Sequence, residues 1–159
     1  MRFVKMECNS SRFDYDSIVS SEGGMGYLWC FLSGVGSDVN ILLEIIQDEP
    51  IEGGSGAFYI FTVEPNVYIG FECDDLGDEQ RIIFKDDPKY YPFKTTKNGF
   101  INLVQQWVKV HKERPPGISI EETSTDVWLV KSMTENEVEH YKKFADPDTG
   151  FLLDVTTKK

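Results

Sequence analysis

The chain has 159 residues, of which 40% are hydrophobic and 13% aromatic, so it can bury a sizeable core without a metal ion or a disulfide. This composition excludes a disordered acidic tail, and the net charge of −11 works against nucleic-acid binding because phosphates would be repelled. We expect a single domain over residues 1–159, with a core at about 25–122 and a C-terminal extension at 123–159.

The sequence indicates neither secretion nor a membrane span. The first residues, MRFVKMEC, are too few and too charged for a secretory signal, and no stretch approaches the ~18 apolar residues that cross a bilayer. The cysteines, Cys8, Cys30 and Cys73, show no Cys-x-x-Cys spacing, which favours buried thiols in a reducing compartment. A cytoplasmic protein that binds no membrane is therefore predicted.

The first third of the chain is expected to contribute short strands. Phe3–Cys8 has the composition of a strand, and the polar stretch 9–22 predicts a loop or a short helix. Tyr27–Leu32, an apolar run between glycine-rich turns, predicts a strand buried on both faces. Asp38–Ile46 fits both a strand and a helix, and its β-branched residues favour a strand.

The middle of the chain carries the clearest β-pattern. After an exposed loop at 47–56, the aromatic and β-branched runs Phe58–Val63 and Val67–Cys73 are separated by three turn residues, which predicts a hairpin. Asp74–Asp78 predicts an acidic turn, and Arg81–Lys85 predicts the next strand. Together these three strands would form an antiparallel meander.

From Gly99 the apolar residues follow the period of a helix. Pro115, Pro116 and Gly117 end the pattern. We expect this helix to lie across the meander and to bury Trp107 against it. The apolar stripe consists of Phe100, Leu103, Val104, Trp107, Val108 and His111.

The last forty residues predict a strand, a helix and a final strand. Val127–Lys131 is the strand, and Thr134 with Glu137 forms a capping box that opens a helix to about Ala145. Phe151–Val155 is a further expected strand. The predicted class is α+β, with an antiparallel sheet of about five to seven strands, one main amphipathic helix packed on it and a shorter C-terminal helix.

The negative charge is concentrated in one third of the chain. Residues 38–87 hold thirteen acids and two bases, Arg81 and Lys85, while residues 1–37 and 88–159 are close to neutral. A dense negative field attracts a positively charged partner, although acids also serve solubility alone. The predicted binding surface consists of Asp48, Glu49, Glu52, Glu64, Glu72, Asp74, Asp75, Asp78, Glu79, Asp86 and Asp87.

The sequence offers little catalytic chemistry. His111 closes the apolar stripe of the main helix, and His140 lies among charged residues in the last helix, so neither indicates a general base. There is no zinc-ligand spacing, and the segment 146–150 departs from a calcium loop because Pro147 interrupts it. We expect no catalytic residues, no metal site and no cofactor.

The segment after the main helix resembles a known family. Lys112 to Glu122 reads KERPPGISIEE, and it is similar to the helix and Arg-Pro segment of the first-numbered immunity family of bacterial polymorphic-toxin and contact-dependent inhibition systems. Arg114, Pro115, Ile118 and Glu121 fit that pattern, and Ile120 stands where it has an aromatic residue. The resemblance, which spans about residues 25–122, implies an immunity protein that binds a basic nuclease or deaminase toxin.

Two other classes of function remain open at this stage. The acids, among them the pairs Asp74/Asp75 and Asp86/Asp87, could serve a small enzyme as catalytic carboxylates or metal ligands. An acidic DNA mimic or adaptor without a toxin partner would have the same charge pattern. The preferred hypothesis is a non-enzymatic antitoxin that neutralises a basic toxin through an acidic surface.

Overall fold

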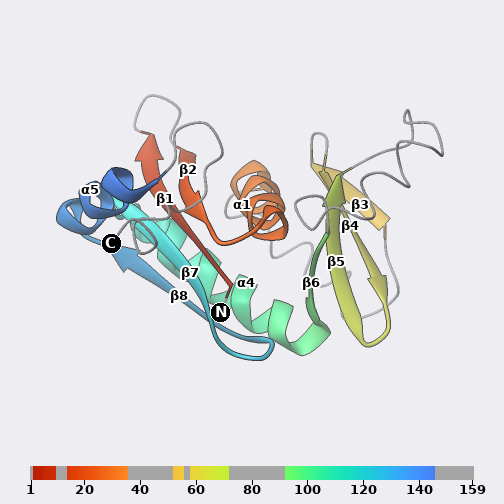
Figure 1. Ribbon diagram of the computed structural model, residues 1–159. Coiled ribbons are helices and arrows are strands. Elements are labelled where there is room, and N and C mark those ends of the chain that lie inside the picture. Colours follow the sequence, from red (N-terminus) through yellow and green to blue (C-terminus); the bar gives the residue numbers. More distant parts are fainter. Residues whose placement is uncertain (1, 10–13, 36–51, 56–57, 72–91, 146–159) are drawn as a thin grey trace, which may run out of the picture.

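A computed structural model describes residues 2–9, 14–35, 52–55, 58–71 and 92–145 of the chain. In this part of the chain, eight strands form two four-stranded antiparallel sheets, which are accompanied by three helices (Figure 1). The expected α+β class is therefore confirmed. The strands do not form the single sheet that we expected, because they divide into two sheets with helices between them.

The first sheet, sheet A, joins the two ends of the described chain. Its order is β2 (Asp14–Ser20), β1 (Phe3–Asn9), β7 (Gly117–Ser124) and β8 (Val127–Met133). The expected strands at Phe3–Cys8 and Val127–Lys131 are thus confirmed. Residues before 25 and after 122, such as Val4 and Val130, belong to the same buried cluster as the middle of the chain.

The second sheet, sheet B, contains the predicted hairpin. Its order is β3 (Glu52–Ser55), β4 (Phe58–Val63), β5 (Asn66–Phe71) and β6 (Phe93–Thr96). The hairpin prediction is confirmed, because β4 and β5 pair in register from Phe58 with Phe71 to Val63 with Asn66. The prediction of a loop at 47–56 is wrong for Glu52–Ser55, which pairs with β4.

The main helix has the predicted boundaries and the predicted buried face. Helix α4 (Lys97–Glu113) begins after Thr96, whose side chain accepts a hydrogen bond from the Gly99 N–H, and ends at Arg114 in a left-handed conformation. All six residues of the predicted stripe are buried. The expected partner is wrong: α4 packs mainly against β8 of sheet A and touches β5 and β6 less extensively.

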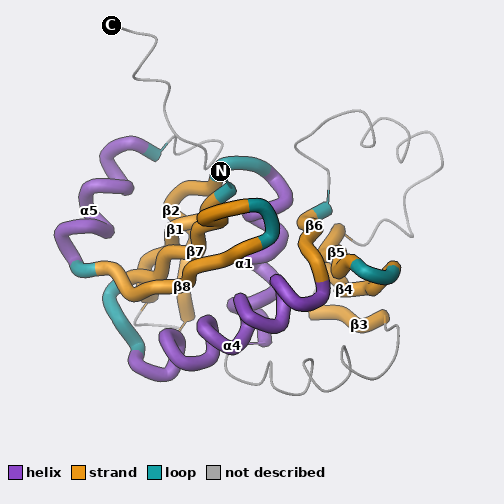
Figure 2. The backbone as a smooth tube through the Cα atoms, turned by 90° about the horizontal axis from the view of Figure 1, so that it is seen from below, coloured by secondary structure: helices purple, strands orange, loops and turns teal. Residues whose placement is uncertain are grey.

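The apolar run Tyr27–Leu32 is part of a helix, so the predicted buried strand is wrong. Helix α1 (Gly23–Val35) lies between the two sheets and contacts strands of both (Figures 1 and 2). A helix that is covered on several sides has no polar face, and its apolar run then resembles that of a buried strand. A Cβ on Gly24 would lie 3.2 Å from the Phe93 backbone, so glycine permits the close approach of α1 to β6.

Helix α5 (Glu135–Phe144) covers the opposite face of sheet A. It begins at Thr134, and both hydrogen bonds of the predicted capping box are present. The helix covers a second buried cluster that is formed by Ile18, Val19, Met133 and Val138. Sheet A therefore has α1 and α4 on one face and α5 on the other (Figure 1).

Two strands of sheet A were missing from the sequence-based expectation. The stretch 14–20, expected as a loop or short helix, forms β2, and a bulge opposite Lys5 and Met6 leaves Ile18 without a register partner. The bulge interrupts the alternation of apolar and polar residues, which hides the strand in the sequence. The strand β7 does alternate over Ile118–Glu121, so its sequence is compatible with a strand although none is predicted there.

Some expectations lie outside the described residues. These are the strands at Asp38–Ile46, Arg81–Lys85 and Phe151–Val155 and the turn at Asp74–Asp78. Cys73 also lies outside, whereas Cys8 and Cys30 are half-buried instead of fully buried.

Candidate functional site

Two of the eleven predicted binding residues lie in the part of the chain that the structure describes. Glu64 lies at the turn between β4 and β5, where it is exposed and accepts a hydrogen bond of 2.6 Å from Lys97 Nζ. Glu52 begins β3, opposite Phe61 of β4. The other nine lie outside the described residues: Asp48, Glu49, Glu72, Asp74, Asp75, Asp78, Glu79, Asp86 and Asp87. The acidic surface thus stays a prediction.

The described part of the acidic third forms most of sheet B. Strands β3, β4 and β5 all lie within residues 38–87, and only β6 comes from outside this range. The acidic stretches 36–51 and 72–91 each connect to a strand of this sheet. Sheet B is therefore the described structure nearest in the chain to the acidic stretches.

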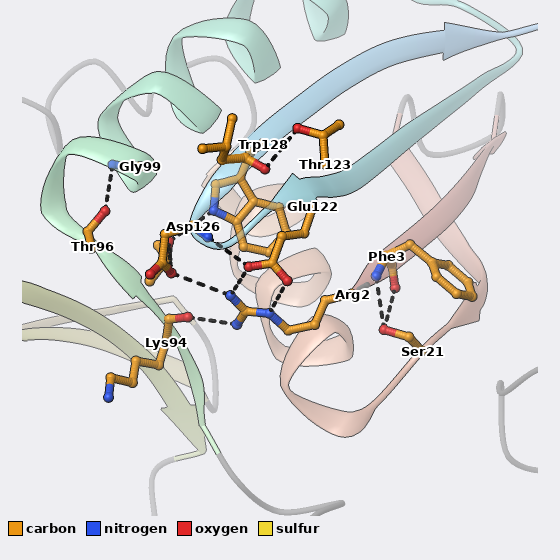
Figure 3. Close-up of polar contacts among 12 residues, drawn as sticks. Arg2, Phe3, Ser21, Lys94, Thr96, Gly99, Glu122, Thr123, Asp126 and Trp128 are labelled. Atoms are coloured by element: carbon orange, nitrogen blue, oxygen red, sulfur yellow. Dashed lines mark hydrogen bonds and ion pairs between the residues drawn. The ribbon is translucent and has the colours of Figure 1, made fainter.

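A guanidinium group connects sheet B to sheet A. Arg2, which immediately precedes β1, donates to both carboxylate oxygens of Glu122 on β7, at 3.1 and 2.8 Å (Figure 3). Its third hydrogen bond, of 2.7 Å, goes to the backbone carbonyl of Lys94 on β6. The guanidinium carbon also lies 4.8 Å from the centre of the Trp128 ring and 5.4 Å from that of Phe93.

The turn between β7 and β8 extends this network. Asp126 adopts a left-handed conformation with φ of 59°, and its N–H donates to Glu122 at 2.9 Å. The Asp126 carboxylate accepts a hydrogen bond of 2.8 Å from the Thr95 hydroxyl of β6, which in turn accepts one of 2.9 Å from Trp128 Nε1. A second polar chain thus joins the two sheets beside Arg2.

The electrostatics of this network indicate a structural role. The hydrogen bond from Arg2 lowers the pKa of Glu122 to about 2, although burial acts in the opposite direction. Among the described residues, every buried side-chain nitrogen and oxygen has a hydrogen-bond partner. Because these contacts join strands of the two sheets, we interpret them as a brace that fixes sheet B to sheet A. The Arg2 brace is defined by Arg2, Thr95, Glu122, Asp126 and Trp128.

A second charged cluster lies on the opposite face of sheet A, under helix α5. The ammonium group of Lys5 is buried, and it donates to Ser119 Oγ at 2.6 Å and forms an ion pair with Glu121. It also lies 5.0 Å from the centre of the Tyr141 ring of α5. A serine beside a lysine can act as a nucleophile, but Ser119 is fully buried, which favours a structural ion pair here.

Two hollows flank the Arg-Pro segment between α4 and β7. The first has a volume of about 420 Å³ and is lined by Glu7, Cys8, Arg114, Pro115, Pro116, Glu135, Val138 and Glu139. The second, of about 470 Å³, lies toward the start of α5 and shares Pro115, Pro116 and Glu135. Both proline carbonyls are held in place, by the Tyr15 hydroxyl at 2.7 Å and by the Cys8 N–H at 2.8 Å.

The residues that carry the family resemblance have different environments in the structure. Arg114 is exposed and its guanidinium carbon lies 5.6 Å from the centre of the Tyr15 ring. Ile118 and Ile120 are fully buried in the core. Glu121 pairs with Lys5. The motif therefore combines a helix C-cap with the first buried residues of a central strand.

The two histidines of the described residues lie apart from the charged clusters above. His111 is buried, with its ring 5.7 Å from that of Tyr15 and 5.1 Å from that of Trp107. Across the residues that the structure describes, no three His, Cys, Asp or Glu side chains come close enough together to hold a metal ion. In the same part of the chain, no helix has the length and apolar composition of a membrane span.

Sequence reasoning missed the residues of the Arg2 brace. Arg2 and Glu122 are 120 positions apart, and Arg2 and Lys94 are 92 apart, so no local spacing connects them.

Comparison of the chain with protein-family models, with curated proteins and with solved structures gives no match.

Proposed function

We propose that this chain is an immunity-type protein that binds and neutralises a basic toxin domain through an acidic surface on residues 38–87. The observation that carries the proposal is the charge segregation, with a net charge of −11 in this third of the chain. The resemblance of Lys112–Glu122 to an immunity family supports it. A cytoplasmic location, where the protein would meet a toxin after its entry, is part of the same proposal.

The architecture is compatible with this function in one specific respect. The acidic stretches connect to strands of sheet B, and the Arg2 brace holds sheet B against the rest of the protein. A surface that is held in place before binding loses less conformational entropy when its partner arrives. If the acidic stretches share the position of the strands that they follow and precede, their charges would contribute to affinity as well as to solubility.

Electrostatic attraction would act at two stages of binding. A concentrated negative field accelerates the encounter with a basic protein by about 10- to 1,000-fold at low ionic strength. After docking, close charge pairs contribute about 1.5–7 kcal/mol each. A few such pairs with an apolar anchor would reach the nanomolar affinity, about −12 kcal/mol, that protection of a cell from a toxin requires.

The first test measures binding to a basic toxin domain, which would be sought among the proteins encoded beside this chain. Reversal of two charges with Asp75→Lys and Asp78→Lys should lower the association rate constant at least tenfold at low salt. The matched control, Glu135→Lys with Glu139→Lys, makes the same charge change on exposed residues of α5. It should have a much smaller effect. Equal effects of the two double variants would contradict the acidic-surface mechanism.

The second test measures protection. Cells that produce the same neighbouring-gene protein should survive only when this chain is co-expressed, and survival should decline with the Asp75→Lys and Asp78→Lys variant. If the native chain binds the neighbouring protein but gives no protection, the proposed neutralising function is wrong.

A further inference from the structure

The edge of sheet A at β8 has an unusual closure. β8 is the last strand of the sheet, and β7 is its only partner among the described strands. It also carries the two large hydrophobic side chains that are exposed in the described part of the chain, Val127 at 50% and Leu129 at 39%. An apolar edge strand with free backbone groups is a template for pairing with another chain.

The side chain of Gln106 occupies the backbone groups at this edge. Gln106 projects from α4, and its Oε1 accepts a hydrogen bond of 3.0 Å from the Val130 N–H. Its Nε2 donates to the Trp128 carbonyl at 2.9 Å. The amide is oriented by Asn102, one turn earlier in α4, whose Oδ1 accepts from the same nitrogen at 2.7 Å. One carboxamide thus provides a donor and an acceptor, as a neighbouring strand would.

We infer that Gln106 closes the β8 edge against strand addition, and that the partner it excludes is a second copy of this chain. If two copies of β8 paired around a two-fold axis at Leu129, Trp128 of each strand would lie opposite Val130 of the other. Residues that face each other in this way exchange two hydrogen bonds, and one of the two, from the Val130 N–H to the Trp128 carbonyl of the other copy, uses the groups that Gln106 occupies.

The composition of β8 favours such self-pairing. In the two-fold register, Lys131 lies opposite Val127 and not opposite another lysine, so no like charges oppose each other. Val127 and Leu129 of both copies would form one apolar strip on the same face. Valine and tryptophan are suited to a strand, and Lys131 is the one charged residue of β8, so at the centre of the edge the amide of Gln106 is the obstacle to pairing.

The test compares Gln106→Ala with Gln105→Ala. Gln105 is the adjacent residue of α4, but it is exposed and makes no contact with β8 that the structure describes. We expect Gln106→Ala to strengthen self-association at least tenfold in sedimentation equilibrium over a dilution series, and Gln105→Ala to behave as the native chain. Amide exchange of Val130 in the monomer should accelerate at least tenfold in Gln106→Ala only.

A second substitution separates edge pairing from loss of folding. Leu129→Lys places like charges at the two-fold axis and should abolish the self-association of Gln106→Ala while leaving its monomer folded. Gln106→Glu, which retains the acceptor for Val130 but has no donor for Trp128, should also associate. Equal self-association of Gln106→Ala and Gln105→Ala would overturn the inference, as would an association that Leu129→Lys leaves intact. None of these measurements requires a toxin partner.

Discussion

At the scale of single residues, Arg2 and Glu122 connect segments that lie far apart in the sequence. Their paired hydrogen bonds link β1 to β7, and the third bond of Arg2 reaches sheet B. The side chain of Glu122 is only 8% exposed. Removal of one partner of such an ion pair destabilises a protein strongly, because the other charge remains buried without a partner.

The pKa of Glu122 leads to a prediction about acid stability. The contacts in the folded protein lower the pKa of this carboxyl group from its ordinary value of 4.5 to about 2. The stabilisation is therefore complete above about pH 4.5 and is lost as the pH falls toward 2. In urea unfolding, the free energy of the native chain should fall between pH 5 and pH 2.5 by about 2 kcal/mol more than that of Glu122→Gln.

Glu64→Gln is the matched control for this measurement, because Glu64 is also paired with a base but is 58% exposed. Its pH dependence should follow that of the native chain. Parallel curves for the native chain and Glu122→Gln would show that the Arg2 brace does not contribute to acid stability.

At the scale of elements, the sequence predicts those whose signal is local. The stripe of α4 and the capping box of α5 depend on neighbouring residues, and both are found as expected. Helix α1 was mistaken for a strand because its surroundings come from both sheets, which no local period reveals. Strand β2 was missed because its bulge at Ile18 breaks the alternation.

The capping box of α5 allows a quantitative test. The Thr134 hydroxyl accepts from the Glu137 N–H at 3.2 Å, and the Glu137 carboxylate accepts from the Thr134 N–H at 3.2 Å. Thr134→Ala should lower the free energy of unfolding by about 1 kcal/mol, while Thr134→Ser, which keeps the acceptor, should lose much less. Urea denaturation gives this value. A loss of equal size in both variants would mean that the hydroxyl is not responsible.

At the scale of the whole molecule, the two sheets could not have been derived from the sequence. The position of one sheet against the other depends on contacts between distant segments. Examples are the contacts of Arg2 with Lys94 and of Thr95 with Asp126. The candidate surface was predicted from charge alone, and the structure describes two of its eleven residues, Glu52 and Glu64.

The concentrated charge predicts a dependence of stability on salt. Thirteen acids lie within the fifty residues 38–87, and we expect folding to increase the repulsion among them, which salt screens. The melting temperature should rise by about 3 °C between 10 and 500 mM NaCl, which corresponds to about 1 kcal/mol. In Asp74→Asn with Asp75→Asn the rise should be smaller. A melting temperature that falls with salt would show that ion pairs such as Lys97–Glu64 outweigh the repulsion.

The position of β1 in the middle of sheet A has a consequence for biosynthesis. β1 pairs with β7, and Phe3 lies opposite Glu121. During synthesis, β1 therefore cannot form this pairing until β7 has been translated. At ordinary translation rates this delay is on the order of 10 s. During that time the nascent chain has β1 and β2 without their central partner, whereas the hairpin β4–β5 can form as soon as it emerges. Sheet A is therefore completed only after β8, which ends at Met133, has left the ribosome.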